Sequence, residues 1–94
     1  MGEFEKIFGR SAQLIVLEYL ISNRDRITYL SGIAEATGLS HSSVTRVVEP
    51  LLKANIVKEN NIGKQMRTFV LNMDNERTKL LIRFFDDLED IPCG

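Results

Sequence analysis

The amino-acid sequence predicts a single, mainly helical α+β domain, and three observations lead to that fold class. Apolar residues recur at helical spacing in several segments, most regularly in residues 41–55. A glycine corner at residues 38–40 separates that segment from another predicted helix. Residues 56–72 place β-forming residues on both sides of a glycine-containing turn, which is typical of a hairpin.

Two helices are expected before residue 23. Residues 1–9 contain an apolar set at the spacing of one face of a short helix, namely Phe4, Ile7 and Phe8. Ser11 is a plausible N-cap, so a second helix should begin at Ala12 and continue to about Ser22. Because this second helix is apolar on nearly every side, we expect it at the centre of the fold.

A short extended segment precedes the third predicted helix. Residues 27–29 are β-branched and aromatic, which favours a brief strand or an extended lead-in. Either Thr28 or Ser31 could cap the helix that follows, which should end near Thr37. Gly38 occupies the position where a left-handed C-cap is expected.

The helix predicted from His41 to about Asn55, with Ser40 as its N-cap, has two different faces. Its apolar stripe follows the i, i+3, i+4, i+7 spacing and consists of Val44, Val47, Val48 and Leu51. Its opposite face is polar and consists of Ser42, Thr45, Arg46, Glu49 and Lys53, with His41 at the start. Short hydrogen-bonding side chains and an arginine, on a helix entered through a glycine corner, are typical of a helix laid in a DNA groove.

Pro50 lies inside this predicted helix. It removes one backbone hydrogen bond and crowds the carbonyl of Arg46, so a kink or a weakened turn is expected there. The alternative is that the helix stops at Glu49. Leu51 and Leu52 would then lie in a loop, which burial disfavours.

A hairpin and a final helix complete the chain. The predicted hairpin consists of strands at residues 56–60 and 65–72 and a turn at residues 61–64. Asp74 or Asn75 should cap a helix that continues to about Leu88 and that Pro92 stops. The apolar stripe of this helix consists of Leu81, Phe84, Phe85 and Leu88, widened by Leu80, Ile82 and Ile91.

This order of elements resembles that of a winged helix-turn-helix domain. Residues 33–57 follow the pattern I-A-x-x-T-G-L-S-x-S-x-V-x-R-x-x-x-x-L-x-x-x-x-I-V, and the hairpin reads KENNIGKQMRTFVLN. These features resemble the multiple-antibiotic-resistance and arsenical-resistance repressor families of bacteria and archaea. The sequence departs from those families in a longer lead from Thr28 to Ile33 and in being less basic than a typical DNA binder.

The resemblance implies one winged helix domain over residues 1–94. It comprises an N-terminal segment at 1–9, a core at 11–72 and a C-terminal helix at 74–91 that serves dimerisation. It also implies a transcriptional regulator, most typically a repressor, that binds double-stranded DNA in a sequence-specific manner.

In a helix-turn-helix protein, the N-terminal residues of the recognition helix meet the base edges in the major groove. That rule selects His41, Ser42, Ser43, Thr45 and Arg46. Arg46 could fork onto O6 and N7 of guanine, a contact worth about 1–3 kcal/mol of discrimination, whereas Lys53 more typically meets the backbone. The wing candidates for phosphates or an adjacent minor groove are Asn60, Asn61, Lys64, Gln65 and Arg67.

Ordinary structural roles are the alternatives for these residues. Serines and threonines on a helix face are often only solvated, and His41 could be plain surface chemistry. Arg46 could be a surface charge paired with Glu49, one turn further along the helix. Lys64 and Arg67 could be charges that protect the edge of the hairpin.

The net charge of −1 argues against a nucleic-acid binder, but its distribution matters more. Residues 1–40 contain four basic and five acidic residues, residues 41–68 contain five and two, and residues 69–94 contain three and six. The basic excess therefore falls on the predicted recognition helix and wing. A winged helix that serves as a protein-interaction module in a larger assembly is the rival hypothesis, favoured by the near-neutral charge and by Glu49 on the polar face.

The terminal segments carry more apolar surface than one small core needs. We therefore expect a homodimer, with recognition helices about 34–36 Å apart on a near-palindromic site. The expected dimerisation residues are Phe4, Ile7, Phe8, Leu81, Phe84, Phe85 and Leu88. The alternative is that both terminal helices fold back over the core of one protomer.

Several function classes find no support in the sequence. The single histidine, His41, belongs to no nucleophile set, and phosphate-loop motifs are absent, so we expect no enzyme and no cofactor. Cys93 stands alone, so no metal site is expected and a reducing, cytoplasmic interior is the default. No apolar run approaches the ~20 residues of a membrane span, and no secretory signal is expected. A small-molecule effector, of unknown identity, would have to lodge between the terminal helices and the core.

Overall fold

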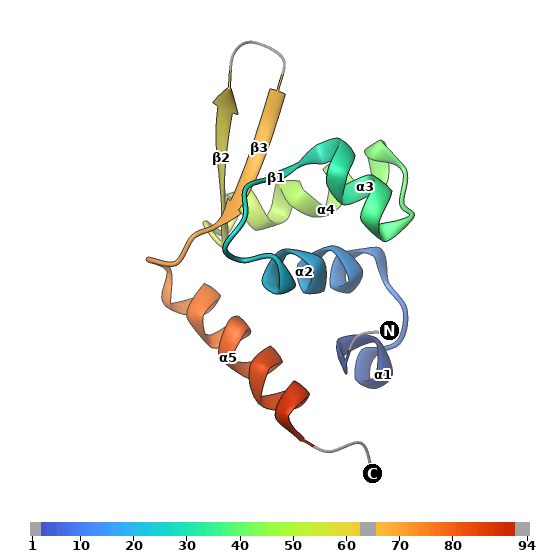
Figure 1. The fold of residues 1–94 in the computed structure, drawn as a ribbon, viewed down its shortest axis with the longest axis vertical. Coiled ribbons are helices and arrows are strands. Elements are labelled where there is room, and N and C mark those ends of the chain that lie inside the picture. Colours follow the sequence, from blue (N-terminus) through green and yellow to red (C-terminus); the bar gives the residue numbers. More distant parts are fainter. Residues whose placement is uncertain (1–2, 63–65, 92–94) are drawn as a thin grey trace.

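The computed structural model describes residues 3–62 and 66–91, and these residues form five helices and three strands (Figure 1). In chain order the elements are α1 (Glu3–Phe8), α2 (Ala12–Ser22), β1 (Thr28–Tyr29), α3 (Leu30–Thr37), α4 (His41–Lys53), β2 (Val57–Ile62), β3 (Met66–Leu71) and α5 (Glu76–Asp90). The expected mainly helical α+β class is confirmed. None of the described helices is long and apolar enough to cross a membrane.

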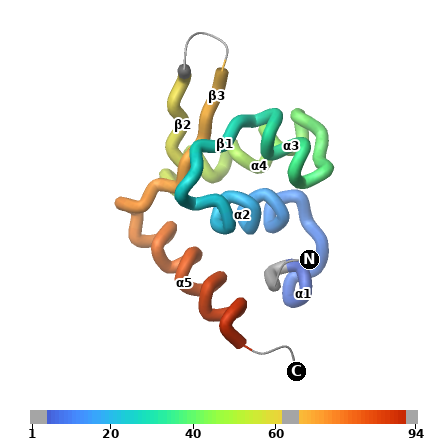
Figure 2. The backbone as a smooth tube through the Cα atoms, in the orientation of Figure 1, coloured from blue at the N-terminus to red at the C-terminus, as the bar shows by residue number. Residues whose placement is uncertain are grey.

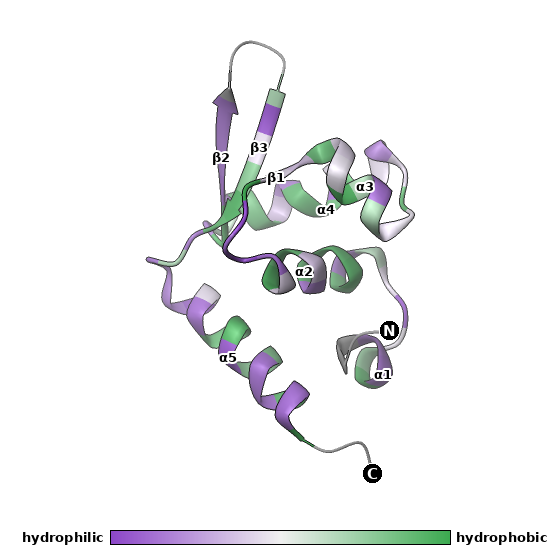
Figure 3. Cartoon of the chain, in the orientation of Figure 1, coloured by the Kyte–Doolittle hydropathy of each residue, from purple (hydrophilic) through white to green (hydrophobic). Residues whose placement is uncertain are grey.

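Helix α2 lies at the centre of the fold, as expected, and contacts α1, α3, α4 and α5. Val16 and Ile21 on this helix are completely buried. Figure 3 shows α2 as mostly hydrophobic along its length. Ser11 caps the helix as predicted, because its hydroxyl oxygen accepts a hydrogen bond from the N–H of Leu14 at 3.2 Å. Figure 2 shows α5 on the opposite side of α2 from α3 and α4.

The corner between α3 and α4 is built as predicted. Gly38 has a left-handed φ of 75°, and its N–H donates to the carbonyl of Ala34 at 2.9 Å, which ends α3. Ser40 then caps α4, because its hydroxyl oxygen accepts from the N–H of Ser43 at 3.2 Å. One glycine therefore ends α3, and one capping serine begins α4 two residues later.

The start of α3 differs from the prediction. The N-cap position is Tyr29, whose side chain makes no capping bond, and Ser31 lies inside the helix. Thr28 is buried in β1, and its hydroxyl donates to the carbonyl of Phe69 at 3.0 Å. Neither predicted residue caps α3, because β1 pairs with β3 and carries Thr28 into the sheet.

Helix α4 continues through Pro50 to Lys53, so a helix end at Glu49 is wrong. Its predicted stripe is buried, namely Val44, Val47, Val48 and Leu51. The burial of Leu51, with 7% of its surface exposed, gives the chain a reason to stay helical past the proline. The kink expected at Pro50 stays a prediction.

The strands form an antiparallel sheet in the order β1-β3-β2. Val57 pairs with Leu71 at the base of the wing, and Asn61 pairs with Arg67 further out. The predicted hairpin is thus confirmed, but β2 includes Asn61 and Ile62, which were expected in the turn, because they pair with Arg67 and Met66. Residues 63–65 lie outside the described residues. The sheet joins the wing to the start of α3, since β1 runs directly into that helix.

Helix α5 has Asn75 as its N-cap, one of the two predicted candidates. The side-chain oxygen of Asn75 accepts from the N–H of Arg77 at 2.8 Å. The helix ends at Asp90, slightly beyond the predicted end, and Pro92 lies outside the described residues. The core face of α5 consists of Thr78, Ile82 and Phe85.

Three asparagines, Asn55, Asn72 and Asn75, join the end of α4 to the start of α5, and we call them the asparagine joint. Asn55 follows α4 with a left-handed φ of 60°. Its carbonyl accepts hydrogen bonds from the side-chain amides of Asn72 and Asn75, both at 2.9 Å. Asn75 also donates to the carbonyl of Ala54 at 3.2 Å. These bonds satisfy carbonyls at the end of α4 that have no partner within the helix.

Candidate nucleic-acid interface

The polar face of α4 points away from the core. Val44 and Val48 have 0% and 1% of their surface exposed, whereas Arg46, which lies between them in sequence, is exposed. The other predicted contact residues of this helix divide into the exposed His41, Ser42 and Lys53 and the half-buried Ser43 and Thr45. The helix therefore presents to solvent the side on which the sequence analysis placed its DNA contacts.

Hydrogen bonds within the first turns of α4 engage all three of the predicted hydroxyls, since the hydroxyl oxygens of Ser42 and Ser40 lie 3.2 Å apart. The Ser43 hydroxyl oxygen accepts from the Ser40 hydroxyl at 2.9 Å, and the Thr45 hydroxyl donates to the carbonyl of His41 at 2.9 Å. Both side chains are thereby held against their own helix. Arg46 is longer and exposed, so it is better placed to reach a surface in front of α4.

Two cations, Arg46 and Lys53, lie on the outer face of α4. Within residues 3–62 and 66–91, neither Arg46 nor Lys53 has an ion-pair partner. The alternative in which Glu49 pairs with Arg46 is wrong, because Glu49 pairs with Arg67 at 3.4 Å. Arg46 and Lys53 are therefore available to a phosphate or a base.

Arg67 has a different place from the one predicted for a wing cation. Its Nε and Nη2 donate to the two carboxylate oxygens of Glu59 at 2.7 and 3.0 Å. Nη2 also donates to Glu49 at 3.4 Å, and the guanidinium lies 5.3 Å from the ring centroid of Phe69. The hydrogen bond from Arg67 lowers the pKa of the Glu59 carboxyl, so this pair stays charged.

This cluster connects three elements, because Glu49 belongs to α4, Glu59 to β2 and Arg67 to β3. It connects the wing to α4, and the DNA contact expected of Arg67 stays a prediction. Glu59 is not among the contact residues predicted from the sequence. The signal for it is the placement of opposite charges on the two strands of the predicted hairpin, near each other across the turn.

The remaining predicted wing contacts fall into two groups. Asn60 and Asn61 are exposed on β2. Lys64 and Gln65 lie outside the described residues. The wing thus offers side-chain amides along the described part of β2, beside the strand that carries Arg67.

The predicted dimerisation residues are separated by the structure. Phe85 is only 3% exposed and belongs to the core of the protomer, so its assignment to a dimer contact is wrong. Leu81 and Leu88 are half-buried against the core, and the side chain of Phe4 lies outside the described part. The exposed members are Ile7, Phe8 and Phe84. Leu80 and Ile91, which were expected only to widen the apolar stripe, are the most exposed apolar residues of the C-terminal segment, at 63% and 62%.

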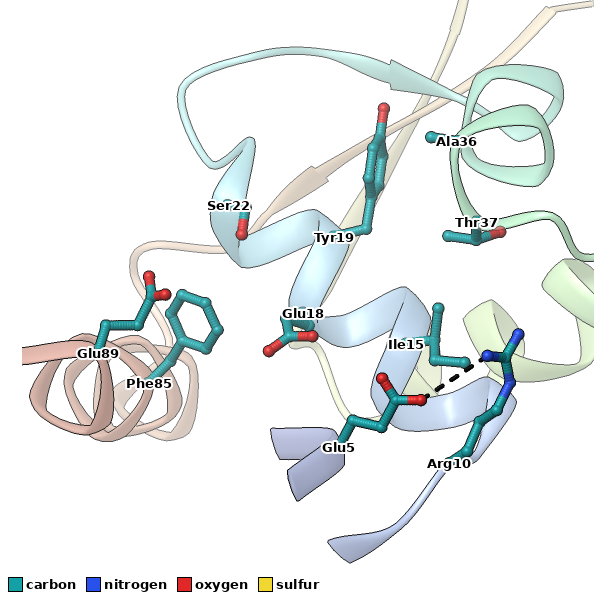
Figure 4. A pocket seen from close by; sticks show the side chains of 10 residues that line it. All are labelled: Glu5, Arg10, Ile15, Glu18, Tyr19, Ser22, Ala36, Thr37, Phe85 and Glu89. Atoms are coloured by element: carbon teal, nitrogen blue, oxygen red, sulfur yellow. Dashed lines mark ion pairs between the residues drawn. The ribbon is translucent and has the colours of Figure 1, made fainter. Parts of the chain in front are cut away.

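A cleft of about 440 Å³ lies between the terminal helices and the core (Figure 4). Side chains from α1, α2, α3 and α5 line it, among them Tyr19, Thr37 and Phe85. At its edge Arg10 pairs with Glu5 at 3.8 Å. The cleft lies where the sequence analysis expected an effector, and the existence of such a ligand stays a prediction. No metal-binding cluster of His, Cys, Asp and Glu side chains occurs within the described part of the chain.

The three-stranded sheet, the glycine corner and the capped α4 together define a winged helix-turn-helix fold, and solved structures confirm it. Reduced HlyU from Vibrio cholerae N16961 has a TM-score of 0.68 at 17% identity, over 95% of this chain and 87% of that chain. MepR, a transcription regulator of the Staphylococcus aureus multidrug efflux pump MepA, has a TM-score of 0.66 at 16% identity, over 93% and 65%. The S. aureus MepR–DNA complex has a TM-score of 0.65 at 15% identity, over 94% and 73%.

At these identities the likeness is one of fold. The chain spans slightly less than two thirds of MepR, 65% of its length in the first of these structures. No protein-family profile matches the sequence, and no curated protein does.

Proposed function

We propose that the chain is a sequence-specific regulator of transcription, acting as a repressor, that binds double-stranded DNA as a homodimer. The observation that carries the proposal is the solvent-exposed polar face of α4. On it, Arg46 and Lys53 have no ion-pair partner in the described part of the chain. The existence of a MepR–DNA complex with the same fold supports the proposal.

The first turns of α4 make the base contacts in this proposal. The N–H groups at a helix N-terminus carry partial positive charge and attract phosphate, and His41 and Ser42 are exposed there. Arg46 reaches O6 and N7 of a guanine in the major groove, for about 1–3 kcal/mol of discrimination against other bases. Lys53, near the end of the helix, neutralises a backbone phosphate.

The wing contacts phosphates or the adjacent minor groove beside α4. Its contact residues in this proposal are Asn60, Asn61, Lys64 and Gln65. Arg67 acts indirectly, since its bonds to Glu49 and Glu59 hold the wing at one angle to α4.

The homodimer places two α4 helices in successive major grooves, about 34–36 Å apart. Each protomer offers few cations to DNA, so doubling them raises the affinity and the salt dependence of binding. The exposed apolar side chains of α1 and α5 support self-association, because burying them removes apolar surface from water.

The decisive experiment selects bound duplexes from a random pool and then titrates the chosen duplex against salt. We expect an enriched near-palindromic sequence and affinity that falls steeply with rising salt. Arg46→Ala should reduce the preference for the selected duplex over a random one by about 10- to 100-fold.

Lys53→Ala is the matched control, because it removes a cation of the same helix face that is proposed to contact the phosphate backbone of the DNA. It should weaken binding to selected and random duplexes about equally. If Arg46→Ala keeps the full preference, Arg46 does not read bases. If the wild type binds no duplex at low salt, the regulator proposal fails.

A protein-interaction module in a larger assembly is the second candidate. The net charge of −1 and the exposed carboxylate of Glu49 on the polar face of α4 favour it. Failure to bind any duplex at low ionic strength, in a chain that is folded, is the result that would select this function.

A further inference from the structure

Helix α5 carries a second stripe on the side opposite its core face. Arg77, Leu80, Phe84, Asp87 and Ile91 are spaced alternately by three and four residues, and we call them the outer stripe. This spacing places side chains on one line of a helix that can pack along another helix. All five are exposed, with Leu80 at 63%, Phe84 at 44% and Ile91 at 62%. A single core would need only one apolar stripe, so the outer stripe calls for a separate explanation.

The two charges of the outer stripe have opposite signs and lie at opposite ends of α5. Arg77 lies in the first turn and Asp87 in the last, with Leu80 and Phe84 between them. Among the described residues, neither Arg77 nor Asp87 has an ion-pair partner. By contrast, Asp86 on the side of α5 that faces α2 is paired with Arg24 at 2.7 Å. Within the described part of the chain, Asp86 on the side towards α2 is thus ion-paired, whereas the charged residues Arg77 and Asp87 of the outer stripe are not.

We propose that the outer stripe packs antiparallel on the outer stripe of a second copy of this chain, with the two-fold axis at the level of Ile82. In this register Arg77 faces Asp87 of the partner subunit, and Leu80 faces Phe84 of the partner subunit. The two-fold axis repeats both contacts, so each of these charges faces an opposite charge and each of these apolar side chains faces an apolar one. Met73, 47% exposed in the turn before α5, then lies at the level of Ile91 of the partner subunit.

The self-complementary order of charges is the argument for a second copy over another protein. A parallel pair would set Arg77 against the partner's Arg77 and Asp87 against the partner's Asp87, which costs free energy. Only the antiparallel pair brings cation to anion at both ends while apolar residues meet in the middle. An apolar cleft of about 410 Å³ beside the stripe, lined by Ile56, Arg77, Leu80, Leu81 and Phe84, has room for an apolar side chain of the partner.

The inference deepens the proposed homodimer and rests on it, by naming the surface and the register. Its test is sedimentation equilibrium of the full chain without DNA. The wild type should sediment with twice the protomer mass. Arg77→Glu and Asp87→Arg should each weaken self-association by about 10- to 100-fold, since each turns two attractive contacts into repulsive ones. Both changes suit the helix dipole, an acid near the start and a base near the end, so α5 should stay folded.

Mixing the two variants gives the sharpest result. In the mixed dimer the introduced carboxylate faces the introduced guanidinium, and the native Asp87 faces the partner's Arg77. The mixture should therefore dimerise with near wild-type affinity although neither variant does so alone. The double variant Arg77→Glu/Asp87→Arg should also recover self-association, and a folding defect in either single variant could not produce that recovery.

Lys79→Glu is the charge-matched control on the same helix, because Lys79 lies off the outer stripe and pairs with Glu76 at 3.0 Å. It should leave the dimer affinity unchanged. A monomeric wild type, or single variants that associate as well as the wild type, would overturn the register. Neither outcome depends on DNA, so a protein that dimerises in this way and binds no duplex would refute only the DNA-binding proposal.

Discussion

Helices α4 and α5 share one pattern on their inward sides and differ on their outward sides. Val48 on α4 and Ile82 on α5 are both buried, at 1% and 7% exposure. Outward, α4 presents short hydroxyl side chains and Arg46. On its outward side, α5 presents Leu80 and Phe84, with 63% and 44% of their surfaces exposed.

The difference shows that the inward stripe of a helix determines how the helix packs on the core. The residues on its outward side determine what kind of partner it can bind. A polar face is well solvated until it meets another polar, charged surface such as a DNA groove. Burying exposed apolar side chains away from water lowers the free energy, so these side chains favour a protein partner. Both helices attach to the core in the same way, and their proposed partners differ because their outward residues do.

The largest expected effect comes from the two sides of α5. Ile82→Ala removes a buried side chain and leaves a cavity, so it should lower the free energy of unfolding by about 2–5 kcal/mol. Leu80→Ala removes an exposed side chain and should cost the isolated protomer less than about 0.5 kcal/mol. Urea unfolding at several protein concentrations, extrapolated to dilution, measures both. Equal losses in the two variants would show that the outward side of α5 is covered within one protomer.

A smaller effect separates folding from binding on α4. Ser40→Ala removes the N-cap and should lower the free energy of unfolding by about 1 kcal/mol. Ser42→Ala, at an exposed position two residues later, should change stability little and should weaken duplex binding instead. Thermal unfolding and a duplex titration of both variants distinguish the roles. A reversed pattern would mean that the outward hydroxyl supports the helix and not an interface.

The smallest expected effect concerns acid and the ion pair between the two strands of the wing. Arg67 lowers the pKa of Glu59 below its ordinary value of 4.5 through a hydrogen bond. A carboxyl whose pKa is lower in the folded chain contributes stability above its unfolded pKa, and that stability is lost as the pH falls through the folded value. Glu59→Gln should therefore be less stable than the wild type at neutral pH and should lose less stability below pH 4.5.

The matched control for this acid dependence is Asp86→Asn, because Arg24 lowers the pKa of Asp86 in the same way on the α5 side. Denaturant unfolding at a series of pH values measures all three proteins. Wild-type and Glu59→Gln curves that run parallel into acid would contradict the contact between Arg67 and Glu59. If only Asp86→Asn flattened the curve, the ion pair between β2 and β3 would be absent in solution.

Local signals predicted most of the fold. The stripe of α4, the caps Ser11 and Ser40 and the left-handed Gly38 are each determined by a few neighbouring residues, and all are confirmed. The start of α3 was not predictable in this way. Thr28 is taken into the sheet by Phe69, a residue far along the chain, so a local capping signal was overridden by strand pairing.

The candidate site was predictable in outline and not in its ionic contacts. Which face of α4 points outward follows from the positions of its valines. The sequence does not reveal that Arg67 is engaged by Glu49 and Glu59, since that depends on how the wing approaches α4. Phe85 shows the same limit, because a helix with apolar residues on two sides does not reveal which of them faces the core.

The asparagine joint limits the spacing between half-sites that the proposed dimer can bind. It fastens the helix proposed to read bases directly to the helix proposed to hold the dimer, with hydrogen bonds of 2.9 to 3.2 Å in place of a pliable linker. A dimer of two such protomers would hold its two α4 helices at a fixed separation. One base pair inserted between the half-sites moves one half-site by about 3.4 Å and rotates it by about 34° relative to the other. We expect the asparagine joint to be too short to allow the two α4 helices to follow that change.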